Sequence, residues 1–184
     1  MFEDVNLQRA TPEDGALLCN LLELYIHDLS QFFPVEVGVD GRFGHKSLPT
    51  YWTEPQTRHA FLIKRGSRVA GFILVTRGSP ASDNPEDLDV AEFFVLRSYR
   101  RSGIGYQAAA ALWDTLQGHW VVRVLNANQA GLLFWRRAVS RYTAGAFVER
   151  EGVGRLSGWH VVTFASRAVT NPSQIKTVRQ IGPT

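Results

Sequence analysis

The chain has 184 residues, of which 45% are hydrophobic and 20% are charged, and its formal net charge is +3. These values are typical of one globular domain with a sizeable core, and they argue against a disordered chain. No apolar run approaches the roughly 20 residues that a membrane span needs, so no membrane association is expected. We predict a single domain over residues 1–184, with a core from about residue 5 to residue 166 and a polar tail over 168–184.

The cysteine content and the distribution of charge predict the cellular compartment and the classes of partner. Cys19 is the only cysteine, so no intrachain disulfide can form and a reducing compartment is expected. The N-terminal sequence MFEDVNLQRA lacks the basic and apolar regions of a secretory signal, which leaves the cytoplasm as the predicted location. Basic residues are scattered apart from short clusters at 97–101 and 136–141, so no nucleic-acid partner is expected.

The first third of the chain predicts a strand, a helix and a long loop. Residues 5–9 alternate in polarity, as a short strand does. Thr11 and Pro12 suit the start of a helix. Leucines at helical spacing follow, so this helix is expected to bury one face and to end before Pro34. Residues 35–56 are rich in glycine, proline and aromatic side chains without periodicity, which predicts a loop with a short helix.

The remainder of the chain predicts further strands and two long helices. Strands are expected at residues 60–64, 69–76, 88–96, 120–125, 143–149 and 159–165, and helices at 104–116 and 131–141. The first two of these strands form a hairpin, and strand 88–96 is apolar on both faces, which indicates a central position. This order predicts an α/β fold (an α+β mixed sheet), with a central mixed β-sheet flanked by helices on both sides.

The segment Arg100-Arg101-Ser102-Gly103-Ile104-Gly105 follows strand 88–96 and opens the next helix. Its glycines remove side chains that would keep an anion from the backbone, and the helix start offers free N–H groups and the positive end of a dipole. The arginines can add charge-assisted contacts to a pyrophosphate or a 3′-phosphate. The alternative is an ordinary helix start with solvated arginines. A dinucleotide fingerprint or a P-loop is excluded, because the third glycine and a Gly-Lys-Ser/Thr sequence are missing.

The pattern R-x-x-G-x-G after an apolar strand resembles motif A of the GNAT superfamily of N-acetyltransferases. The order of strands and helices also matches that fold, so the resemblance extends from about residue 7 to residue 165. A second GNAT signature, an asparagine followed seven residues later by an aromatic residue, is matched by Asn128 and Trp135 in NANQAGLLFWRR. The Phe134-Trp135 pair, together with HDLSQF near the N-terminus, is similar to a small bacterial branch of the superfamily.

The resemblance implies a GNAT-like acyl-CoA N-acyltransferase fold and an enzyme that takes acetyl-CoA (coenzyme A) as acyl donor. It implies transfer of an acetyl group to a primary amine of a small molecule or a peptide, by direct attack in a ternary complex. By this resemblance, backbone groups of Phe94, Val95 and Leu96 contact the pantetheine arm of the cofactor, and Asn128 contacts the pantetheine near the thioester. By the same resemblance, the pyrophosphate is bound by Arg100, Arg101, Ser102, Gly103, Ile104 and Gly105. Strand 120–125 is expected to splay from strand 88–96, so that the thioester lies between them. No metal is expected, because the histidines lack the spacing of metal ligands, and a homodimer is an open alternative.

Trp135 occupies the position where many GNAT enzymes have a tyrosine that protonates the leaving thiolate. An indole N–H donates a hydrogen bond but is no practical acid, so Trp135 is expected to pack against the cofactor's arm or within the core. Tyr142 is a weaker candidate for the general acid. The missing tyrosine also supports a second hypothesis, that of a catalytically silent GNAT-like module that binds or senses CoA.

Residues outside these motifs are candidates for the acceptor site. Glu92 lies within a phenylalanine-rich strand sequence, where it is either a general base or points to solvent. Some GNAT enzymes place a glutamate base on this strand, which supports the first alternative. Tyr25 and Asp28 near the end of the first helix, with Tyr51 and Trp52 in the long loop, are candidates for contacts with the acceptor. For Asp28, a solvated helix end is the alternative.

Overall fold

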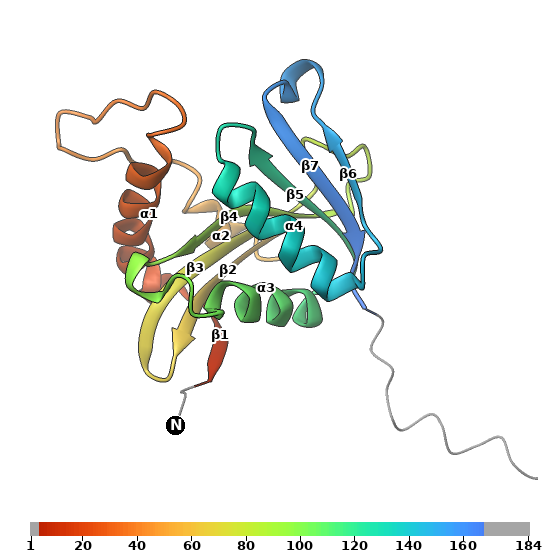
Figure 1. Cartoon of the computed structure of the whole chain (residues 1–184). Helices are drawn as coiled ribbons and strands as arrows, with labels where there is room; N and C mark the ends of the chain where they lie inside the picture. Colours follow the sequence, from red (N-terminus) through yellow and green to blue (C-terminus); the bar gives the residue numbers. More distant parts are fainter. Residues whose placement is uncertain (1–3, 168–184) are drawn as a thin grey trace, which may run out of the picture.

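The computed structural model describes residues 4–167, which form one sheet with helices on both of its faces (Figure 1). The strands are β1 (Val5–Arg9), β2 (Arg58–Arg65), β3 (Arg68–Arg77), β4 (Leu88–Val95), β5 (His119–Leu125), β6 (Val148–Glu151) and β7 (Trp159–Ala165). The helices are α1 (Gly15–Leu29), α2 (Thr50–Thr53), α3 (Ile104–Thr115) and α4 (Gln129–Thr143), with 3₁₀ turns at Pro12–Asp14, Arg97–Tyr99 and Gly154–Leu156. The predicted tail 168–184 lies outside the described residues.

The strand order in the sheet is β1-β2-β3-β4-β5-β7-β6. The strands β1 to β4 follow one another as antiparallel neighbours, and β7 pairs antiparallel with both β5 and β6. The parallel pair is β4 and β5, which are joined by the crossover through α3. The predicted mixed sheet and the predicted order of elements are confirmed. Within residues 4–167, no helix has both the length and the apolar character needed to cross a membrane.

The two faces of the sheet bury different side chains, because residues along a strand alternate in direction. In β2, Phe61 and Ile63 join the core cluster that contains residues of α3 and α4, whereas Ala60 and Leu62 join the cluster that contains residues of α1 and α2. Figure 1 shows α3 and α4 in front of the sheet. The central strand β4 contributes to both clusters, as its apolar sequence predicted.

The predicted strand 143–149 is correct only at its last two residues, because β6 spans Val148–Glu151. Helix α4 continues to Thr143, because Tyr142 belongs to the buried face of that helix and is only 1% exposed. The helix ends where Ala144 and Gly145 adopt positive φ angles of 54° and 89°. The strand β6 starts only after this turn, at Val148, so the strand that pairs with β7 is shorter than predicted.

Candidate active site

The neighbouring strands β4 and β5 pair over only part of their length and then separate. Their ladder ends at Val90, which lies opposite Val122. A β-bulge at Ala91 accompanies the separation, since Val90 and Glu92 lie opposite consecutive residues of β3. The expected splay of these two strands is therefore present. From Ala91 onwards, β4 has no strand partner on the side that faces β5, and we call this side the open edge of β4.

The 97–103 loop joins the open end of β4 to α3. It turns at two residues with positive φ, Arg101 at 61° and Gly103 at 84°, and α3 begins directly after it. Ser102 Oγ donates a hydrogen bond of 2.7 Å to the carbonyl of Tyr99. The loop is therefore a compact turn whose shape depends on glycine at the second of these positions.

The start of α3 leaves backbone donors free. Among the described residues, the N–H groups of 101–106 have no protein acceptor, and Gln107 is the first to donate back, to the carbonyl of Gly103. Such a row of donors at the positive end of a helix suits a pyrophosphate. The glycines differ in role, because a Cβ on Gly105 would come within 3.1 Å of the Phe134 ring. Gly105 therefore allows α3 to pack closely on α4, whereas the shape of the turn before the free donors depends on Gly103.

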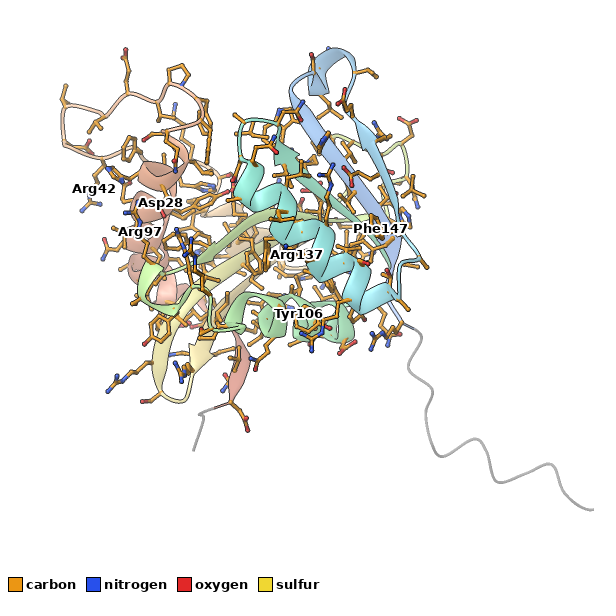
Figure 2. All side chains as sticks on the ribbon, viewed as in Figure 1. Asp28, Arg42, Arg97, Tyr106, Arg137 and Phe147 are labelled. Atoms are coloured by element: carbon orange, nitrogen blue, oxygen red, sulfur yellow. The ribbon has the colours of Figure 1, made fainter. Side chains whose placement is uncertain are left out.

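Arg100 is held by contacts within the protein. Its Nε donates to the Val95 carbonyl at 2.7 Å, its Nη2 donates to Asp28 Oδ2 at 2.5 Å, and its guanidinium lies over the Phe94 ring. Arg97 donates to the other Asp28 oxygen at 2.6 Å, and Figure 2 shows Asp28 and Arg97 beside each other at the end of α1. Burial would raise the pKa of Asp28, but the hydrogen bonds from Arg97 and Arg100 outweigh it and hold the pKa below its usual range. Asp28 therefore holds the loop through both arginines, and its predicted contact with the acceptor stays a prediction.

Other residues assigned to the cofactor lie along the same path. Phe94 packs in the core under α1 and Ile104 in the core on the opposite face, so their side chains belong to the interior. Leu96 donates its N–H to the carbonyl of Ala70 in β3 at 2.8 Å, whereas the Arg101 side chain is exposed. This segment therefore offers a ligand the free backbone donors at the start of α3 and the Arg101 guanidinium.

The Glu92 carboxylate lies on the face of the sheet that α1 and α2 cover, beside Tyr25 of α1 and Tyr51 of α2. Burial, reinforced by the charge of Glu92, raises the pKa of Tyr25 well above its usual value and raises the pKa of Tyr51 to about 12. Both phenols therefore stay protonated at neutral pH and can act as hydrogen-bond donors. The predicted residues Glu92, Tyr25 and Tyr51 therefore form one group. Trp52 of α2 is half-buried and packs beside the start of α1, where its Nε1 lies near Gly15.

Further charged residues on this face were missed by sequence reasoning. Asp89 of β4 is fully buried, and Arg123 of β5 donates to its two oxygens through two contacts of 2.9 Å. In the loop before α2, His45 Nε2 lies 3.6 Å from Glu92 Oε1. The sequence contained a signal for the buried pair, because each member is a charged residue within a mainly apolar strand, LDVAEFFV or HWVVRVL. No pattern in the loop sequence marks His45.

The acetyltransferase (GNAT) family model matches residues 22–139. The chain belongs to the GNAT family. An acetyltransferase from Thermus thermophilus is 20% identical and has a TM-score of 0.67, over 90% of this chain and 99% of that one. A GNAT acetyltransferase from Streptococcus agalactiae is 12% identical, with a TM-score of 0.63 over 91% and 99% of the chains. The yncA protein from Salmonella typhimurium, solved with its cofactor acetyl-CoA, is 12% identical, with a TM-score of 0.59 over 91% and 97%. A search of curated proteins gave no significant match.

In this GNAT chain, the second predicted motif lies on α4. Asn128 Oδ1 accepts a hydrogen bond of 2.9 Å from the N–H of Gly131 and so caps the helix. Trp135 is 7% exposed and packs against Phe93 and Trp113, with ring centroids 4.9 and 6.3 Å away. Packing within the core, one of the two roles expected for Trp135, is present, and contact with the cofactor's arm stays a prediction.

Tyr142 lies near the far end of α4, away from the open part of the GNAT sheet. It packs against Phe164, which is paired with Trp120 where β4 and β5 are still joined. Its hydroxyl donates to Asp114 Oδ1 at 2.7 Å, and Arg167 lies over its ring. Burial and the Asp114 carboxylate raise the pKa of Tyr142 to about 12. Tyr142 is therefore not placed to protonate the leaving thiolate, because its hydroxyl donates to Asp114 near the end of α4 that lies away from the opening.

Proposed function

We propose that this GNAT protein is an acetyl-CoA-dependent N-acetyltransferase of the cytoplasm, the compartment that its single Cys19 favours. The observation that carries the proposal is the open edge of β4, which leads from the Glu92 carboxylate to the free N–H groups of 101–106. Two structures with the same fold support the donor. The yncA structure contains acetyl-CoA, and RimL, a ribosomal L7/L12 alpha-N-protein acetyltransferase, was solved with coenzyme A.

The acceptor in this proposal is a primary amine of a small molecule or a peptide. Acetyl-CoA supplies an acetyl group that is activated as a thioester, and the N–H groups of 101–106 hold its pyrophosphate. An alkyl amine has a pKa near ~10.4, so roughly one molecule in two thousand is neutral at pH 7. Glu92 takes the proton from the ammonium form, and the neutral amine then attacks the carbonyl in a ternary complex. Tyr25 and Tyr51 stay protonated beside the carboxylate.

Departure of the thiolate needs no acid from the protein in this mechanism. The aromatic residue of the second motif, Trp135, is a buried indole, and Tyr142 is remote. A thiol of ordinary acidity, with a pKa of ~8.5 as in cysteine, is a good leaving group without prior protonation. The same buried Trp135 favours one second candidate function, a module that binds CoA without transferring the acetyl group.

Turnover with a panel of amines tests the proposal and separates the two functions. Purified protein is mixed with acetyl-CoA, and both free thiol and acetylated product are measured. We expect Glu92→Gln to lower kcat by about 10²-fold or more near pH 7, to leave CoA affinity unchanged, and to recover partly near pH 9.5 as more amine is neutral. Glu86→Gln, which alters an exposed carboxylate paired with Arg77, is the matched control and should keep full activity.

One result would contradict the proposed transfer of an acetyl group, and another would contradict only the role of Glu92 as the base. Binding of CoA without transfer to any amine would support the silent module. Transfer that falls equally near pH 7 and near pH 9.5 in Glu92→Gln, or that does not fall at all, would remove Glu92 as the base.

A further inference from the structure

His45 lies next to the proposed base but belongs to the loop between α1 and α2. Its Nε2 is 3.6 Å from Glu92 Oε1, and the two side chains are 15% and 25% exposed. On the other side of the ring, Ser47 Oγ lies 3.5 Å from His45 Nδ1. The imidazole therefore stands between the carboxylate on the sheet and the outer part of the loop.

The position of His45 is fixed from α1. The two carboxylate oxygens of Glu23 accept backbone hydrogen bonds from Phe43 at 2.7 Å and from Gly44 at 3.0 Å. Charge-assisted bonds to two consecutive backbone groups hold the loop directly before His45. The contacts of Glu23 with Phe43 and Gly44 therefore help to hold His45 close to Glu92.

The other titratable groups around Glu92 keep one protonation state near neutral pH. Burial and the nearby carboxylate hold the pKa of Tyr25 well above its usual value and raise the pKa of Tyr51 to about 12. Burial would lower the pKa of Arg123, but the Asp89 carboxylate outweighs it and raises the pKa. Histidine is the side chain whose charge ordinarily changes between pH 5 and pH 8. Of the neighbours of Glu92 within residues 4–167, the histidine is therefore the one suited to exchange a proton.

His45 also lines a surface depression beside α1, together with Glu23, Glu36, Asp40 and Arg42. Figure 2 shows Arg42 on the outlying loop to the left of α1. The depression gives the imidazole access to water. The ring therefore lies beside the proposed base and is also reached by solvent.

We propose that His45 is a proton relay between Glu92 and solvent, a role that rests on the proposed acetyl transfer. An N–H bond of the acceptor ammonium breaks as an O–H bond forms on Glu92. That O–H bond then breaks as His45 Nε2 takes the proton, through a small approach of the two groups or through one water. The transfer to His45 restores the carboxylate. The imidazolium then releases a proton from Nδ1 to water, and exchange of the Nε2 proton with water returns the ring to the tautomer that accepts at Nε2.

The test compares His45→Ala and His45→Gln with the unsubstituted protein in the amine acetylation assay. Both variants are expected to lower kcat near pH 7 by about 10²-fold, to leave CoA affinity unchanged, and to lose less near pH 9.5, where the amine needs less help. Added imidazole should restore part of the activity of His45→Ala but none of that of Glu92→Gln. His27→Gln, an exposed histidine on α1 whose ring lies 6.5 Å from that of Phe43, is the matched control.

The double variant Glu92→Gln/His45→Ala separates a relay from a merely structural contact. If the proton passes through both groups, the double variant is no slower than Glu92→Gln alone. Full activity of both His45 variants alongside an impaired Glu92→Gln would overturn the relay and leave the proposed function intact. Losses that add up in the double variant and resist imidazole would also overturn it. Absence of transfer by the unsubstituted protein to every amine would refute the proposed function and the relay together.

Discussion

Asp28 on α1 and Arg100 in the 97–103 loop are joined by an N–H···O contact of 2.5 Å, although 72 positions separate them in the sequence. Arg97 uses the second oxygen of the same carboxylate, and Arg100 also reaches back to the Val95 carbonyl. The loop that leads to the free donors of α3 is therefore braced by the helix that covers Glu92. The Asp28 carboxylate therefore links α1, which covers Glu92, to the loop that precedes the free donors of α3.

Arg100→Ala is expected to weaken CoA binding. If the guanidinium contacts the pyrophosphate, the substitution removes a charge-assisted bond to the ligand worth about 1.5–3 kcal/mol, and it also removes the contact with Asp28 that holds the loop. Because ~1.4 kcal/mol is a factor of ten, the Kd for CoA should rise roughly tenfold to a hundredfold. Calorimetric titration measures it, with Arg155→Ala as an exposed control. An unchanged Kd would exclude Arg100 from any part in the site.

Asp28 is expected to make stability depend on acid. Its folded pKa lies below the unfolded value of ~3.9, so its contribution is full above that value and is lost as pH falls through the folded pKa. The deficit of Asp28→Asn in free energy of unfolding should therefore be present at pH 7 and shrink at about pH 3. Urea denaturation at both values measures it. A deficit of the same size in acid would contradict the paired carboxylate.

Gly103→Ala is expected to affect CoA binding through the backbone alone. Gly103 has a φ of 84°, and an added Cβ would meet only Gln107 Nε2, at 3.5 Å. Gly145 is a matched control, with a φ of 89° and nothing within 4 Å of an added Cβ. Each substitution should cost about 1–2 kcal/mol of stability. Only Gly103→Ala should also raise the Kd for CoA. Equal Kd values in the two variants would remove the turn from the anion site.

Arg123→Met is expected to destabilise the fold strongly. The substitution leaves the fully buried Asp89 carboxylate without its paired cation, and breaking such a pair costs about 3–5 kcal/mol. Arg77→Met is the comparison, because Arg77 pairs with Glu86 at an exposed position, where ion pairs contribute less than about 1 kcal/mol. Chemical denaturation measures both. Similar losses in the two variants would mean that Arg123 does not neutralise Asp89.

Trp135 is expected to behave as a core residue. Trp135→Ala should cost about 3–5 kcal/mol of stability, because it empties a buried ring site against Phe93 and Trp113. Trp135→Phe should keep most of the activity, and Trp135→Tyr should give no gain in turnover. Thermal unfolding and steady-state kinetics measure the three variants. A strong rise in kcat for the tyrosine variant at unchanged CoA affinity would show that an acid at this position matters.

The order of elements could be predicted because it depends on neighbours in the chain. Short apolar runs joined by a turn mark β2 and β3, and leucines at helical spacing mark α1. Where periodicity became ambiguous, the prediction failed. Thr143 can begin a strand on its sequence, but the packing of Tyr142 in the core keeps that turn of the chain helical.

The sequence by itself determined the turn before α3, through R-x-x-G-x-G, and it indicated the family through that motif together with the second motif and the order of elements. The effect of R-x-x-G-x-G is local, since the positive φ of Gly103 and the free donors at the start of a helix follow from adjacent residues. Only the tertiary structure decided the partners of the charged groups. Asp28 meets Arg100, and His45 meets Glu92, because the packing of α1 on the sheet brings distant segments within a few ångströms. Such contacts leave no pattern in the order of residues, as each depends on how whole elements pack.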